Sequence, residues 1–104
     1  MKLKKLKIGY ESYDIDWWTA TNATSNEASG EFFAKDKKIG IDARESGAQL
    51  VNTVLHEALH AVVYQQGLKL ENDQEELVVN SVANGLTGIL VDNPLFITWI
   101  KEQL

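Results

Sequence analysis

The stretch TVLHEALHAVVYQQGL, residues 53–68, decides how the second half of this chain folds. Apolar residues recur every three or four positions from Leu50 to Val62, which is the period of an amphipathic α-helix. Gly67 suits the left-handed conformation that ends many helices, with Leu68 folding back on the helix. The stretch therefore predicts a helix from Ser46 with one apolar and one polar face. The polar face contains Gln49, Thr53, His56, Glu57, His60 and Tyr64.

This polar face carries a complete His-Glu-x-x-His motif, formed by His56, Glu57 and His60. The two histidines, which are the only ones in the chain, are four residues apart, so a helix presents both to one ion. A catalytic zinc ion takes three protein ligands and leaves one position for water, whose pKa it lowers to about 7. Glu57 can take the proton of that water. The motif predicts a zinc-dependent hydrolase, most readily a peptidase.

The third zinc ligand must be a residue other than histidine, and carboxylates after Gly67 are the candidates. They are Glu71, Asp73, Glu75 and Glu76. Glu76 shares a helical face with Asn80 and Ala83, a small and partly polar face that can approach the first helix. Asn80 can then hydrogen-bond a ligand. The matching positions for Glu75 are apolar and typical of a core. The pattern favours Glu76, Glu75 remains the alternative, and the carboxylate that is not a ligand would face the helix dipole.

Alternation of period two before residue 46 predicts strands. One pair covers residues 5–10 and 13–17, joined near Glu11-Ser12, and a second hairpin joins residues 30–34 to 38–42. Residues 19–29 are small and polar and predict a loop. The last strand, Lys38 to Asp42, is a candidate edge to which an extended peptide could add beside the zinc.

Two further helices are predicted after Gly67. One begins near Asn72-Asp73, with a capping residue at either position and Glu75 or Glu76 near the capping-box position. Pro94 suits the first turn of a short last helix, which would close the core. Trp17, Trp18 and Trp99 are expected to pack inside. The chain is therefore an α+β protein with a small antiparallel N-terminal sheet, two long helices bearing the site and a short C-terminal helix.

The composition excludes several classes of protein. The net charge is −5, with 15 acidic against 10 basic residues, which argues against nucleic acid as the main partner. The absence of cysteine rules out disulfides and thiolate metal sites and fits a reducing compartment. The apolar runs are too short for a bilayer span, and the N-terminus lacks the apolar region of a signal peptide. At 104 residues we expect one domain, 1–104, in the cytoplasm, with no membrane partner.

The motif helix, glycine stop, acidic pair and second helix resemble the gluzincin class of zinc peptidases. More closely, the chain resembles short phage- and prophage-encoded proteins that are minimal relatives of the ImmA/IrrE-type metallopeptidases. The matching stretches are residues 53–68, EELVVNSVANGL at 75–86, VDNPLFITWI at 91–100 and GIDAR at 40–44. The resemblance implies zinc on His56 and His60, a glutamate as third ligand, Glu57 as base, and a phage or prophage origin in a bacterial host.

Two functions follow as hypotheses. The leading one is zinc-dependent hydrolysis of a peptide or protein substrate, with Zn²⁺ on His56, His60 and Glu76 and with Glu57 as the catalytic base. The alternative is a non-catalytic metal-stapled protein, for instance a phage interaction or assembly factor. Loss of activity in Glu57→Gln with zinc retained would distinguish them.

Overall fold

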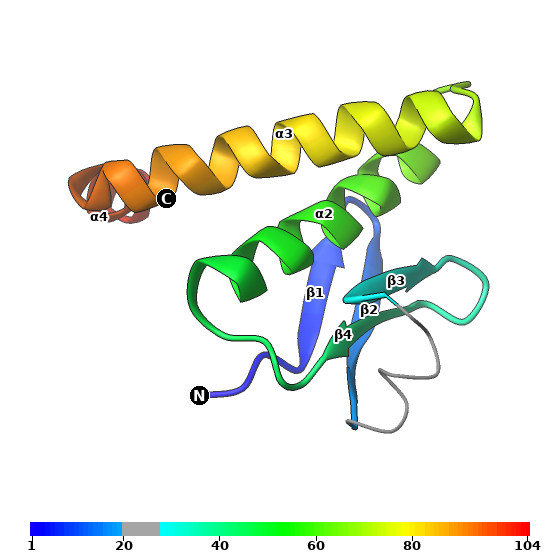
Figure 1. Cartoon of the computed structure of the whole chain (residues 1–104), viewed down its shortest axis with the longest axis horizontal. Coiled ribbons are helices and arrows are strands. Elements are labelled where there is room, and N and C mark those ends of the chain that lie inside the picture. The colour runs from blue at the N-terminus through cyan, green and yellow to red at the C-terminus, as the bar shows by residue number, and fades with distance from the viewer. Residues whose placement is uncertain (20–27) are drawn as a thin grey trace.

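The computed structural model describes residues 1–19 and 28–104, so residues 20–27 of the predicted loop lie outside the described part. In the part described, a four-stranded sheet comes first and helices follow, which confirms the predicted α+β class (Figure 1). The sheet, α2 (Gly47–Gln66) and α3 (Asn72–Asp92) form successive layers, with α2 in the middle. Over the described residues, no helix is long and apolar enough to cross a membrane.

The first hairpin joins β1 (Lys5–Ile8) to β2 (Glu11–Trp18). Its turn is Gly9-Tyr10, two residues earlier than predicted, and Gly9 has a φ of 59°, which glycine adopts without strain. The end of α2 is tied to this hairpin, because the Gln65 amide donates hydrogen bonds to the Ile8 carbonyl at 2.7 Å and to the Tyr13 hydroxyl at 2.9 Å. A Cβ on Gly9 would lie 2.1 Å from Gln65 Oε1, so a larger residue here would displace the Gln65 side chain.

The second hairpin joins β3 (Gly30–Phe33) to β4 (Lys38–Asp42), as predicted. The strand order is β1-β2-β4-β3, and β2 pairs with β4 in parallel. The sheet is therefore mixed and not wholly antiparallel as expected. The difference arises because the hairpin places its second strand beside β2, and that strand runs in the same direction as β2.

Strand β4 lies inside the sheet, so the prediction of an edge at Lys38 to Asp42 is wrong. Its last four residues are all buried, which fits a strand covered on both faces. Gly40 is needed there because an added Cβ would lie 2.2 Å from Cζ2 of the buried Trp18. The edge beside the helices is β3, whose pairing among the described residues is with β4 alone.

Helix α2 begins after Ser46 and ends at Gly67 in the left-handed conformation, with a φ of 66°, as predicted. The Leu68 N–H bonds back to the Val63 carbonyl at 3.2 Å, which satisfies the last turn. The predicted division into one apolar and one polar face is only partly correct. Thr53 and Glu57 are buried against the sheet, whereas the apolar residues Val51 and Val62 are exposed. The core that α2 helps to cover comprises Tyr13, Ile15, Ile39, Ile41 and Ala61.

Helix α3 is capped by Glu71 and not by Asn72 or Asp73 as expected. The Glu71 carboxylate and the Gln74 side chain form a reciprocal capping box, and Glu75 and Glu76 take no part in it. The buried residues of α3 are Val79, Ala83 and Thr87, at intervals of four.

Helix α4 (Pro94–Gln103) has Pro94 in its first turn, as predicted. It contacts α3 and no other described element, and none of its residues is buried, so it does not close the core. Trp99 is 56% exposed and not the packed residue that the sequence suggested, whereas Trp18 is in the core.

Candidate metal centre

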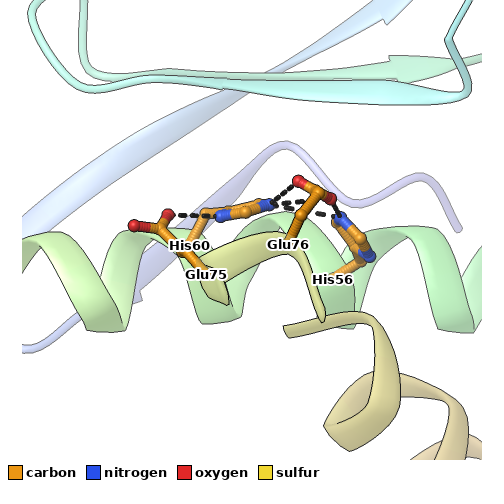
Figure 2. Close-up of polar contacts among 4 residues, drawn as sticks. All are labelled: His56, His60, Glu75 and Glu76. Carbon is orange, nitrogen blue, oxygen red and sulfur yellow. Dashed lines mark hydrogen bonds and ion pairs between the residues drawn. The ribbon is translucent and has the colours of Figure 1, made fainter. Parts of the chain in front are cut away.

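Helices α2 and α3 bring three potential ligand groups together, His56 and His60 from the first and Glu76 from the second (Figure 2). Their ligand atoms all lie within 4.8 Å of one another. The Nε2 atoms of the histidines are 3.2 Å apart. Glu76 Oε1 lies 2.7 Å from His56 Nε2, and Glu76 Oε2 lies 3.1 Å from His60 Nε2.

This spacing fits a tetrahedral zinc ion. Zinc bonds to imidazole nitrogen and carboxylate oxygen are about 2.0–2.1 Å long, so ligand atoms of a tetrahedral site lie roughly 3.3 Å apart. With Glu76 Oε1 as the ligand atom, the three separations are 2.7, 3.2 and 3.4 Å, which tetrahedral coordination would change by about 0.6 Å at most. Glu76 is 57% exposed at its side chain, so a metal ion held by these residues would remain accessible to solvent. Three nitrogen and oxygen ligands with an open fourth position are the pattern of catalytic zinc sites.

Glu75 is turned to the opposite nitrogen of one of the two histidines. Its Oε2 lies 2.6 Å from Nδ1 of His60, so adjacent carboxylates reach the two nitrogens of one imidazole. A carboxylate on Nδ1 fixes the tautomer in which Nε2 carries a lone pair, and it orients the ring. The sequence predicted that the second carboxylate would only face the helix dipole, and this interaction was missed. Adjacent residues on a helix point about 100° apart, so the pair Glu75-Glu76 could have indicated two carboxylates that approach one histidine from different sides.

The other carboxylate candidates are used elsewhere. Glu71 caps α3, and Asp73 accepts a hydrogen bond from the Gln74 backbone. Asn80 was expected to hydrogen-bond a metal ligand. It lines the same cleft as the histidines, but the side chain that contacts Nδ1 of His60 is that of Glu75. One turn further on, Asn52 of α2 donates to Asn84 of α3 at 2.8 Å and joins the helices beside the site.

Glu57 lies on the sheet side of α2 and is only 7% exposed. It is covered by β3, which can approach because residue 30 is glycine. A Cβ at Gly30 would be 3.1 Å from Glu57 Cγ and 3.0 Å from Thr53 Cγ2. The glycine therefore sets how close the edge strand lies to the motif helix.

Burial raises the pKa of Glu57 from its ordinary value of 4.5 to about 7. The positive charge that His60 can carry opposes this rise, and so does a hydrogen bond from the Phe32 backbone. The carboxylates of Glu76 and Glu31 add to it. A group with a pKa near 7 exchanges protons readily at neutral pH, which suits a general base.

The three candidate ligands and Glu57 open into one cleft of about 540 Å³. The cleft lies between β3 and the two helices, and its lining includes Gly30, Glu31 and Phe32. The sequence prediction missed these residues because it placed the free edge on the neighbouring strand. Strand β3 therefore forms one wall of the cleft, and the candidate ligands form the other.

No family model, curated protein or solved structure matches this chain. The case for a function accordingly depends on the residues and the geometry of the cleft.

Proposed function

We propose that this protein is a zinc-dependent metallopeptidase. The observation that carries the proposal is the meeting of three zinc-type ligand atoms at near-tetrahedral spacing beside a buried glutamate. His56, His60 and Glu76 would hold the ion, and Glu75 would orient His60. A structural ion-pair cluster would not require Glu57 to be buried next to them with a raised pKa.

A zinc ion held by these residues would act as a Lewis acid on the scissile carbonyl and lower the pKa of a coordinated water to about 7. Glu57 would accept the proton of the attacking water and pass it to the leaving amine. A divalent cation beside Glu57 favours its carboxylate form, which is the form that accepts a proton. The Phe32 N–H would hold that carboxylate in place.

A peptide in extended conformation is the substrate that the cleft suits best. Strand β3 has a partner on one side only among the described residues, and it borders the cleft along Gly30 to Phe32. Backbone groups on a free strand edge bind extended peptides irrespective of most side chains. The substrate would then cross the cleft between β3 and the histidines. The proposed compartment for this reaction is the cytoplasm of the cell that makes the protein.

The test measures zinc content, folding and turnover on the same samples. Wild type, Glu57→Gln and a control, Glu102→Gln in the exposed last helix, are incubated with a broad pool of unstructured peptides. We expect Glu57→Gln to keep its zinc and fold but lose about 100-fold or more of the turnover, as removal of a general base does. Glu102→Gln should behave as wild type.

Two outcomes would contradict the proposal. Equal cleavage by Glu57→Gln and wild type would mean that the proposed base is not used. Stoichiometric zinc without any cleavage by wild type would favour the alternative of a non-catalytic protein in which the metal joins α2 to α3.

A further inference from the structure

An uncharged apolar face of α3 is left open by the rest of the described chain. From Leu77 to Val91, fifteen residues in succession, there is no charged side chain. Val78, Val82 and Ile89 on this face are 46%, 42% and 47% exposed. Together with Gly85 they follow the spacing i, i+4, i+7, i+11, which makes a continuous stripe of the kind found where two helices pack.

Most of this stripe lies away from the metal centre, although Glu75, which contacts His60, is three residues before Val78 and continues the same face. Asn80 and Asn84 mark the flank of α3 that borders the cleft and α2. Val82 is two residues from each, which at 3.6 residues per turn is about 160° around the helix from both. A molecule bound to the stripe would therefore leave the cleft open.

We propose that the stripe is covered by α3 of a second copy of this chain, in an antiparallel twofold dimer. The charge pattern argues against a membrane and against a charged partner. An amphipathic helix that binds membranes carries lysine or arginine on its polar face, and α3 has no basic residue in a chain of net charge −5. A charged protein partner would find no opposite charge on the stripe. The same stripe on a second copy is also apolar and uncharged, so it needs neither basic residues nor opposite charges on α3. Twofold dimers are the commonest assemblies of soluble proteins.

The spacing of the stripe is self-complementary when two copies run antiparallel. A twofold axis between positions 83 and 84 puts Val82 opposite Gly85 of the partner subunit and Val78 opposite Ile89 of the partner subunit. Large side chains then meet a small one at the centre, which lets the helices approach closely. Gly85 has the room for this, because a Cβ there would meet nothing within 4 Å.

The exposed apolar side chains are not confined to α3. Helix α4 continues the apolar surface beyond the end of α3, with Leu95 81% and Trp99 56% exposed. The antiparallel alignment brings α4 of one copy next to the beginning of α3 of the other. This alignment would cover the partly exposed side chains of Val78, Val82, Leu86 and Ile89 together with those of α4.

The first experiment measures mass by sedimentation over a hundredfold range of concentration. Wild type should reach twice the chain mass of 11.6 kDa, and Val82→Glu should remain at the monomer mass. Ser81→Glu is the control, since Ser81 is exposed and next to Val82 but off the stripe. Circular dichroism and zinc content establish that each variant is folded. A monomeric wild type, or a dimer that persists in a folded Val82→Glu variant, would overturn the proposal.

The second experiment tests the register with engineered cysteines. The chain has no cysteine of its own, so every disulfide formed must join the introduced residues. Oxidation of an equal mixture of Val78→Cys and Ile89→Cys should give the mixed disulfide-linked dimer. Val78→Cys alone should not cross-link, because the two copies of position 78 would be about 16 Å apart along the axis at 1.5 Å per residue. Efficient cross-linking of Val78→Cys alone would show a parallel arrangement and contradict the one proposed.

Discussion

The two long helices are of nearly equal length but differ in what holds them. Helix α2 lies between the sheet on one side and α3 on the other, and buries residues toward both. Helix α3 contacts α2 and α4 and, over the described residues, no strand. Helix α2 supplies the two histidines and Glu57, whereas α3 supplies the two glutamates. The candidate site therefore combines residues of α2, which is packed on two sides, with residues of α3, which is packed against α2 and not against the sheet.

A metal ion in this position would therefore also stabilise the fold. Because its ligands come from both helices, its binding free energy would add to the docking of α3 on α2. The metal-free protein depends for that docking on the buried residues of α3 and on polar contacts such as Asn52 to Asn84. The predictions below test this difference between the helices.

Loss of a direct ligand from either helix should have the largest effect. His60→Ala and Glu76→Ala should each weaken zinc binding by more than about 100-fold, since loss of groups that only orient ligands costs up to that much. In wild type, free zinc at 100 times its dissociation constant should stabilise the fold by about 2.7 kcal/mol. Equilibrium dialysis and thermal melts measure both quantities. Gln66→Ala, at the exposed end of α2, is the control, and full zinc affinity in Glu76→Ala would contradict a site shared by the helices.

Removal of metal should reveal the cost of burying Glu57 in α2. Its folded pKa of about 7 is above its ordinary value of 4.5, so the folded protein holds the proton more tightly than the unfolded chain. This contribution to stability is present below pH 4.5 and is lost as the pH rises to about 7. The loss is on the order of 3 kcal/mol.

Urea unfolding of the metal-free protein between pH 4 and 8 measures this loss. The difference in stability between wild type and Glu57→Gln isolates the contribution, because the variant has no proton to lose at this position. Glu57→Gln should gain on wild type as the pH rises. A difference that does not change with pH would show that Glu57 has an ordinary pKa in the folded state.

Glu75 of α3 should have a smaller effect on zinc than Glu76. Glu75→Ala should weaken zinc binding by about 10–100-fold, because the His60 ring loses the carboxylate on its Nδ1. Glu75→Gln keeps an acceptor for the same N–H and should lose less. A competitive titration with a zinc indicator measures these affinities. A larger loss in Glu75→Ala than in Glu76→Ala would exchange the roles of the two residues.

The smallest effects should come from glycines in the two regions. Gly40→Ala brings a Cβ against Trp18 in the sheet and should destabilise the protein by about 1–3 kcal/mol, the usual cost of overpacking. Gly88→Ala in α3 meets nothing within 4 Å and should stabilise it by about 0.8–1 kcal/mol through helix propensity. Denaturant unfolding measures both. Destabilisation by Gly88→Ala would show that this side of α3 is covered.

The sequence predicted local features better than it predicted neighbours. The motif helix, its stop at Gly67 and the start of α4 at Pro94 follow from periodicity and from residues with one strong backbone preference, and these were confirmed. The pairing of β2 with β4 was not predicted, since two strands can pair in either order without changing their own alternation. The wrong position of the free edge followed from this.

The same limit applies to the candidate site. The spacing of His56 and His60 is set within one helix, and so it could be read directly. The interaction of Glu75 with Nδ1 depends on how α3 is rotated against α2, which no single stretch of sequence specifies. The role of Gly30 depends on a strand and a helix more than twenty residues apart in sequence, which come together only in the fold.

The contact between Gln65 and the first hairpin bears on protein engineering. The motif helix could be regarded as a portable unit, to be grafted onto another scaffold. Its end, however, is held through the Gln65 amide to Ile8 and Tyr13, beside a turn in which Gly9 has a positive φ. A graft that transfers residues 47–66 without this hairpin removes both acceptors of the Gln65 amide and leaves the last turn of the helix without support. The smallest transferable unit is the helix together with its hairpin.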